Sequence, residues 1–246
     1  MPLDHVTIVR AEKSPRGGVV LLQEAFGVTD YLRSVGADLA AAGWTVAIPH
    51  LYHRSGSPTF AYEVNQGDGV DDRQAEAERA AAEAIGPHAA QVTVGGIDQD
   101  IDHCLAALAD EGIEEKNTAA VGFCFGGSVA LYLSAQRHLG ASVVFYGAGI
   151  REQHFGVPAF TGIAAERHSP LLAHYGDCDV WIQRDDVDVL DWALALSPVP
   201  FELIHYPDTG HGFHCDRRRT YHAASAAAAW SRTLTWLDDH AGAGLR

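Results

Sequence analysis

A cysteine lies in a short glycine-containing segment with the spacing of a nucleophile elbow. The segment Gly122–Phe123–Cys124–Phe125–Gly126–Gly127 follows a short apolar run, Thr118–Gly122, and precedes apolar residues at helical spacing from Ser128 to Arg137. In such a turn the nucleophile takes strained backbone angles, and glycines two residues before and after it let neighbouring backbone approach. The following helix N-terminus stabilises a thiolate and later an oxyanion. The segment predicts nucleophilic catalysis by Cys124; taken alone, it also fits a buried structural cysteine.

An acid and a histidine follow the cysteine in the chain order that hydrolases with this elbow use. Pro170–Gly176 is a strand candidate, and the loop after it carries two carboxylates, Asp177 and Asp179. A later strand candidate, Phe201–Tyr206, leads into a loop where His211 lies between two glycines, so its imidazole can approach a thiol and a carboxylate freely. We expect Asp179 to be the acid, with Asp177 as second choice. Taken singly, either aspartate could cap the helix that begins near Gln183, and His211 could be a turn residue.

With these segments in view, the chain resembles the dienelactone hydrolase family, cysteine-dependent members of the α/β-hydrolase superfamily. The resemblance spans nearly the whole chain, and its segments are Leu22–Val28, Ile48–Tyr52, the elbow around Cys124, Gly176–Asp179 and Gly210–Phe213. It implies an α/β-hydrolase fold, and it puts the family's triad on Cys124, Asp179 and His211. The family also holds a glutamate against the resting cysteine, and the Gln-Glu-x-Phe-Gly match gives that role to Glu24. The alternative for Glu24 is a solvated loop carboxylate.

The resemblance implies acyl transfer to cysteine as the mechanism. His211 would deprotonate Cys124, Asp179 would support the imidazolium, and the thiolate would attack the carbonyl of a small ester or lactone. Water would then release the acid. The backbone N–H groups of Phe125 and of Ala25, in the loop that contains Glu24, would hold the oxyanion. We expect no cofactor and a small molecule as the substrate.

Several positions depart from the family pattern and concern the substrate. His50 stands where dienelactone-cleaving members have an aspartate, and Cys215 stands where they have an arginine that grips the substrate carboxylate. Arg217–Arg219 follow too late in the chain, and Arg73 or Arg79 lies only roughly where a second arginine would be. Because a planar carboxylate needs a bidentate arginine, we do not expect dienelactone itself to be the substrate.

Composition indicates one enzyme-sized unit. The chain has 246 residues, 47% of them hydrophobic, which fits a single α/β domain over residues 1–246. The formal charge of −15 opposes binding to phosphate backbones, so nucleic acid is not an expected partner. No apolar run reaches the length of a membrane span, and Met1–Val6 lacks the positive region of a signal peptide. We therefore expect no membrane association. A thiol nucleophile needs a reducing compartment to stay usable, so we also expect a cytoplasmic protein without disulfides.

Short apolar runs alternate with helical patterns, which predicts a mostly parallel sheet flanked by helices on both faces. The helix after Glu24 should run from Asp30 to Ala42 and end at Gly43. The stretch 52–69 and the charged segment Asp71–Ala84 fit two interpretations equally well: a surface insertion, or a loop and helix that border the active-site mouth. The expected strands are Val6–Val9, Val19–Leu22, Trp44–Ile48, Thr118–Val121, Ser142–Tyr146, Leu171–Tyr175 and Phe201–Tyr206.

Fourteen histidines raise the question of a metal. The densest cluster is His211, His214, Cys215 and Asp216, but adjacent residues of one loop seldom converge on an ion, so we expect no metal there. His50 and His53 are either close to the pocket or ordinary loop histidines. A second function class also stays open, in which the chain is a redox-responsive or ligand-binding protein on a hydrolase scaffold with Cys124 as a reactive thiol.

Overall fold

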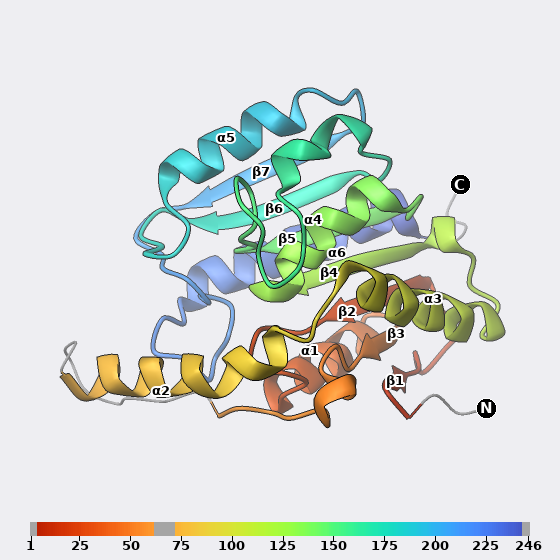
Figure 1. The fold of residues 1–246 in the computed structure, drawn as a ribbon. Helices are drawn as coiled ribbons and strands as arrows, with labels where there is room; N and C mark the ends of the chain where they lie inside the picture. Colours follow the sequence, from red (N-terminus) through yellow and green to blue (C-terminus); the bar gives the residue numbers. More distant parts are fainter. Residues whose placement is uncertain (1–3, 62–71, 243–246) are drawn as a thin grey trace.

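The computed structural model describes residues 4–61 and 72–242, apart from the side chains of 72–79, and within these residues seven strands form one sheet (Figure 1). Their order is β1-β3-β2-β4-β5-β6-β7. Only β1 runs antiparallel, to β3. The strands are β1 Val6–Val9, β2 Gly17–Leu22, β3 Trp44–Pro49, β4 Thr118–Phe123, β5 Ala141–Phe145, β6 Leu171–Gly176 and β7 Phe201–Tyr206. The predicted mostly parallel sheet is confirmed, with strand ends within two residues of their expected positions.

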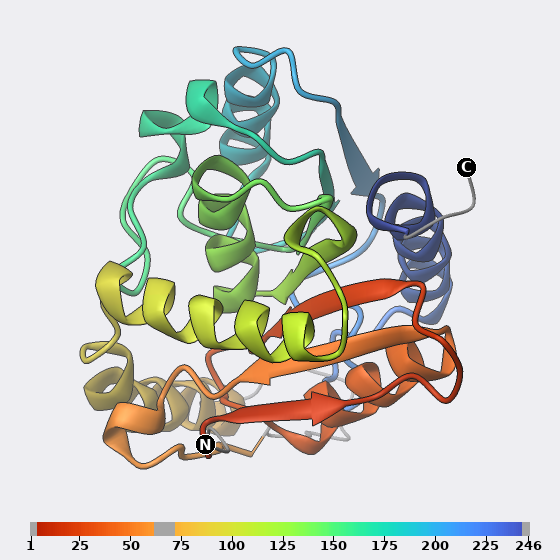
Figure 2. The same ribbon diagram turned by 90° about the vertical axis from the view of Figure 1, so that its right-hand side faces the viewer.

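Strands β2 to β6 are buried along their whole length, because helices cover both faces of the sheet. Helices α1 and α6 lie on one face, and α3, α4 and α5 lie on the other (Figure 2). The helices are α1 Asp30–Ala41, α2 Asp72–Ala89, α3 Val94–Asp110, α4 Phe125–Gln136, α5 Arg184–Leu194 and α6 Ala223–Ala241. The short 3₁₀ helices are η1 His53–Ser55, η2 Glu115–Asn117, η3 Phe160–Gly162 and η4 Ala164–Glu166.

Two adjacent glycines of β2 show how closely the layers pack. A Cβ on Gly17 would lie 2.8 Å from the carbonyl oxygen of Ala241 in α6, whereas a Cβ on Gly18 would lie 3.0 Å from the Leu108 side chain in α3. Successive residues of a strand point to opposite faces, so this pair places α6 and α3 on opposite sides of the sheet. Helix α1 ends as predicted, since Gly43 has a φ of +97°, which favours glycine.

The end of α2 packs close to the elbow. The imidazole of His88 lies near the rings of Tyr52 and Phe60, with centroid separations of 6.2 and 5.6 Å. Tyr52 in turn stacks on Phe125, the residue after Cys124, at 6.3 Å. The contact is made by the C-terminal end of α2, beyond the segment Asp71–Ala84, so both interpretations of that segment stay open. The expected loop 52–69 lies partly outside the described residues, from position 62 onward.

The loops that carry the candidate triad leave the same edge of the sheet. Glu24 follows β2, Cys124 follows β4, Asp179 follows β6 and His211 follows β7, each at the carboxyl end of a parallel strand. Ligand sites of open α/β sheets lie at this edge. Among the described helices, none combines the length and apolar character needed to cross a membrane.

Candidate active site

Cys124 occupies a strained turn between β4 and α4. Its φ of +53° and ψ of −113° lie in a region that side-chain-bearing residues rarely adopt. The turn closes so tightly that a Cβ on Gly122 would collide with the carbonyl oxygen of Gly126, and a Cβ on Gly126 would collide with that of Leu22. Both positions therefore need glycine because neighbouring backbone passes too close for a Cβ, as expected from the sequence. The backbone presents the Cys124 side chain at the N-terminus of α4.

His211 and Asp179 form a buried hydrogen-bonded pair. His211 Nδ1 lies 2.8 Å from Asp179 Oδ2, and the two residues are 8% and 7% exposed. The other carboxylate oxygen, Oδ1, accepts hydrogen bonds from the N–H groups of Trp181 and Ile182 at 2.8 and 3.0 Å. These bonds fix the carboxylate so that Oδ2 faces the imidazole. With Nδ1 committed to Asp179, Nε2 is the ring nitrogen left to exchange a proton with Cys124.

The protonation of His211 is set by two opposing influences. Burial lowers the pKa of His211, but the adjacent Cys124 sulfur and the hydrogen-bonded Asp179 carboxylate outweigh it and raise this pKa to about 10. The imidazole therefore carries its proton at neutral pH. The imidazole, held by Asp179 and adjacent to the Cys124 sulfur, is therefore placed to exchange a proton with that sulfur.

Asp177, the second choice for the acid, lies elsewhere. It is exposed, and it pairs with Arg184 at 3.2 Å and with His205 at 3.0 Å. The N-cap of α5 is Gln183, so neither aspartate takes that position. The geometry thus joins Asp179, and not Asp177, to the histidine.

Glu24 is completely buried, so it is not the solvated loop carboxylate that was its alternative. Arg218 Nη1 donates a hydrogen bond to Glu24 Oε1 at 3.3 Å. Burial lowers the pKa of the Arg218 guanidinium, but Glu24 first and Cys124 next outweigh it and raise this pKa above its ordinary value. One guanidinium thus interacts with both the buried glutamate and the cysteine.

Sequence reasoning missed Arg218, because it stands seven residues after His211 instead of four. The loop folds back through successive turns, with Cys215 N bonded to Gly212 O and Arg218 N bonded to Cys215 O, both at 3.0 Å. A Cβ on Gly212 would collide with the Arg218 guanidinium. The run Arg217–Arg219 was the available signal in the sequence. Only the turns of the folded loop show that Arg218 is the one that contacts Glu24.

Tyr146 is a second residue that the sequence did not single out. It follows β5 directly, has a φ of +41° and is completely buried. Its ring centroid lies 5.0 Å from that of His211, so the tyrosine packs against the imidazole. Burial, and then the neighbouring Tyr31 and Glu24, raise the pKa of Tyr146 well above its ordinary value, so the phenol stays neutral.

A cavity of about 360 Å³ lies beside the loop that carries Asp179, and none of the three triad residues lines it. Its wall includes Trp181 and Ile182, whose N–H groups hold Asp179, and His154, whose pKa is lowered to about 4 by burial and by the nearby His211. This volume suits a small molecule. The cavity is lined by Ala148, Gly149, Ile150, Arg151, Glu152, Gln153, His154, Trp181, Ile182 and Asp186.

The two backbone N–H groups that the sequence assigns to an oxyanion belong to Phe125 and Ala25. Phe125 is the first residue of α4, and neither its N–H nor that of Ala25 donates a backbone hydrogen bond to another described residue. The Tyr52 hydroxyl donates to the carbonyl of Ala25 at 3.0 Å and so fixes the loop after β2. These are the two groups expected from the sequence to hold an oxyanion.

The remaining sequence candidates lie apart from the triad. His50 Nε2 lies 2.9 Å from Thr7 Oγ1, and His53 Nε2 lies 3.0 Å from Asp100 Oδ1, so neither contacts the triad. His214 Nδ1 lies 2.7 Å from the Tyr31 hydroxyl oxygen and so has a partner outside the triad. The side chains of Arg73 and Arg79 lie outside the described part of the chain. All four cysteines are free thiols, and Cys178 is the exposed one.

A model of the dienelactone hydrolase family matches residues 5–241. A protein of Yersinia pestis is 30% identical over 90% of this chain and 78% of its own length. The carboxymethylenebutenolidase of Rhodococcus opacus is 28% identical over 96% of this chain and 86% of its own length.

Solved structures agree with the family match. The "Putative Dienelactone Hydrolase" of Klebsiella pneumoniae superposes with a TM-score of 0.80 at 27% identity, covering 96% of this chain and 92% of that one. A dienelactone hydrolase-like promiscuous phosphotriesterase from metagenomic libraries shares the fold. It superposes with a TM-score of 0.65 at 19% identity, and the match covers 96% of this chain and 99% of that one. The fold is therefore that of the α/β-hydrolases, and the chain belongs to the dienelactone hydrolase family.

Proposed function

We propose that this protein hydrolyses a small ester or lactone through an acyl-cysteine intermediate on Cys124. The observation that carries the proposal is the buried His211–Asp179 pair, 2.8 Å apart, with the pKa of His211 raised by the adjacent Cys124 sulfur. A buried imidazolium held by a carboxylate and facing a cysteine is the arrangement that nucleophilic catalysis by a thiolate needs. The family supports a hydrolase, and these residues support cysteine as its nucleophile.

The residues account for each proton and bond of the reaction. The Cys124 thiolate attacks the carbonyl carbon, and the developing oxyanion accepts hydrogen bonds from the N–H groups of Phe125 and Ala25, each of which is worth about 3 kcal/mol in such sites. The C–O bond breaks as His211 gives its proton to the leaving alkoxide, which leaves a thioester. His211 then takes a proton from water, and the hydroxide attacks the thioester. Release of the carboxylic acid restores the thiolate and the imidazolium.

Glu24 and Arg218 bear on substrate choice. Arg218 supplies a guanidinium at the nucleophile, but its partner there is the buried Glu24 carboxylate at 3.3 Å. A substrate carboxylate would have to displace Glu24 from this guanidinium. Dienelactone therefore stays an unexpected substrate, and an uncharged ester or lactone in the cavity beside Trp181 is the better candidate.

Turnover of an activated ester tests the proposal against the reactive-thiol alternative. A hydrolase should release many equivalents of nitrophenol from p-nitrophenyl acetate per chain. A protein that uses Cys124 only as a reactive thiol should stop after about one equivalent, because the acyl group would remain on the sulfur. A single burst without further release, from protein that is correctly folded, would reject the hydrolase proposal.

Removing the Glu24 charge should speed alkylation of the resting thiol. Glu24→Gln deletes a buried anion whose counterion, Arg218, also interacts with Cys124, so the thiolate gains the attraction of that guanidinium. We expect Glu24→Gln to react faster than wild type with iodoacetamide at neutral pH, even if ester turnover falls. Peptide mass spectrometry in a Cys178→Ser background should follow the reaction, because Cys178 is the other accessible thiol.

Glu202→Gln is the matched control. Glu202 also pairs with an arginine, Arg232, but it belongs to strand β7 and not to the loop after β2 that carries Glu24. This variant should alkylate at the wild-type rate. Unchanged or slower alkylation of Cys124 in Glu24→Gln would contradict the guarding role and leave Glu24 as a structural partner of Arg218.

A further inference from the structure

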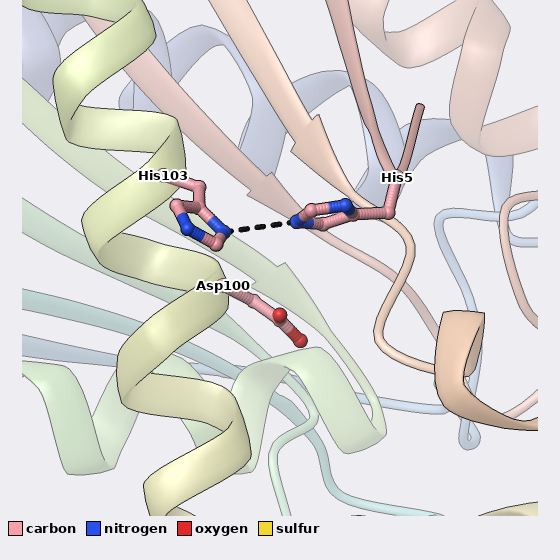
Figure 3. Close-up of side chains that lie close together, drawn as sticks. All are labelled: His5, Asp100 and His103. Atoms are coloured by element: carbon pink, nitrogen blue, oxygen red, sulfur yellow. Dashed lines mark hydrogen bonds between the residues drawn. The ribbon is translucent and has the colours of Figure 1, made fainter. Parts of the chain in front are cut away.

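Three metal-ligating side chains converge between the start of β1 and helix α3 (Figure 3). They are His5, Asp100 and His103, and their ligand atoms all lie within 4.8 Å of one another. Among the described side chains, those of residues 4–61 and 80–242, this is the one such group of three or more histidine, cysteine, aspartate or glutamate residues. His5 Nε2 and His103 Nδ1 point directly at each other, 2.9 Å apart.

The fold brings this set together from distant parts of the chain. Asp100 and His103 are three residues apart on α3, so they share one helix face. His5 directly precedes β1, 98 residues away from its partner His103. Asp100 is 1% exposed, whereas both histidines are partly exposed.

The two imidazole nitrogens are almost at the separation that a bound metal ion imposes. Zinc–nitrogen bonds of about 2.0–2.1 Å in a tetrahedral site place two ligand nitrogens roughly 3.3 Å apart. The observed 2.9 Å would need to open by about 0.4 Å, a change that side-chain rotation can supply. The ring that donates the present hydrogen bond would move its proton to its other nitrogen. Two neutral imidazoles could then bind the ion without net proton release.

Neighbouring side chains orient the carboxylate in the way that metal sites use. Asp100 Oδ1 accepts hydrogen bonds from His53 Nε2 and Arg54 Nη2, both at 3.0 Å, and Oδ2 accepts one from Arg54 Nη1 at 2.8 Å. Oδ2 thus keeps a second lone pair for a cation. The positive charge of Arg54 partly neutralises the Asp100 carboxylate, which reduces the attraction between this carboxylate and a metal ion.

We propose that His5, Asp100 and His103 form a binding site for a divalent first-row transition metal, with Zn²⁺ as the best match. Two imidazoles and one carboxylate suit Zn²⁺ and its neighbours, whereas Mg²⁺ and Ca²⁺ prefer oxygen ligands throughout. Water would complete the coordination. The ion would link β1, an edge strand of four residues, to α3, so its role would be to hold the N-terminal edge of the sheet.

Metal titration of the chelator-treated full chain tests the site. Zn²⁺ binding should be measured against a chromophoric chelator, Co²⁺ binding by its visible absorption, and the Tm with and without Zn²⁺. We expect one ion per chain, a Co²⁺ spectrum without thiolate charge transfer, and a higher Tm with Zn²⁺ because the ion binds only the folded chain. His103→Ala and His5→Ala should each weaken Zn²⁺ binding by at least about tenfold and remove the rise in Tm.

Two further variants separate ligand loss from misfolding and from a cysteine site. His138→Ala is the matched control, because His138 also belongs to a close histidine pair, stacked on His168 at 4.2 Å, and should bind Zn²⁺ like wild type. His103→Gln keeps a hydrogen-bonding side chain, so it should fold with the Tm of metal-free wild type and still bind weakly. Absence of binding in wild type would overturn the proposal. So would wild-type affinity in His103→Gln, or binding that disappears in Cys124→Ala instead.

Discussion

Cys124→Ala and His211→Ala should each lower the rate of ester turnover by about six orders of magnitude, the size of effect seen when a nucleophile or its base is removed from a catalytic triad. Alanine leaves no nucleophile at position 124, and without His211 the thiol loses the imidazole that exchanges its proton. The measurement is steady-state hydrolysis of p-nitrophenyl acetate, with circular dichroism and Tm to show that the fold is kept.

Cys178→Ala is the control for this pair of variants, because Cys178 is the exposed cysteine of the loop that carries Asp179. It should hydrolyse the ester at the wild-type rate. Turnover in Cys124→Ala close to that of wild type would remove the covalent mechanism altogether.

Asp179→Asn should lower turnover by about four orders of magnitude, whereas Asp177→Asn should change it by less than about tenfold. An asparagine at position 179 would keep its carbonyl oxygen on the N–H groups of Trp181 and Ile182, and so present its NH₂ group to His211 Nδ1. The neutral imidazole would then carry its proton on Nε2 and could not accept one from Cys124. Asp177 is exposed and paired with Arg184, where an ion pair contributes little.

Rates of the two asparagine variants should be compared at equal protein concentration and matched Tm. A larger loss in Asp177→Asn than in Asp179→Asn would show that the acid is wrongly assigned. Equal and small losses in both would show that the imidazole does not need a carboxylate partner.

The sheet could be predicted from the sequence because its strands are short apolar runs bounded by glycine, proline or polar residues, and β1 and β7 coincide with their predicted ranges. The elbow could be predicted for a similar reason. Gly122 and Gly126 are required by close backbone contacts within one turn. Because that turn involves only neighbouring residues, its glycines stand at a fixed spacing that can be recognised in the sequence.

Contacts between distant loops could not be predicted in this way. Arg218 returns to Glu24, 194 residues away in sequence, only because the loop after His211 folds through successive turns. His5 and His103 meet across 98 residues, and no periodic pattern in either segment indicates that they do. Such pairs follow from the packed arrangement of elements and not from the propensities of the residues involved.

The central claim is that Cys124 carries the acyl group. Its most direct test is to mix the protein with p-nitrophenyl butyrate, quench with acid during turnover, and map the acylated peptide by mass spectrometry. The mechanism predicts a butyryl thioester on Cys124, removed by hydroxylamine and reduced in amount when turnover is allowed to finish. Sustained turnover with no acyl group on Cys124, or with the acyl group on a serine such as Ser128, would contradict it.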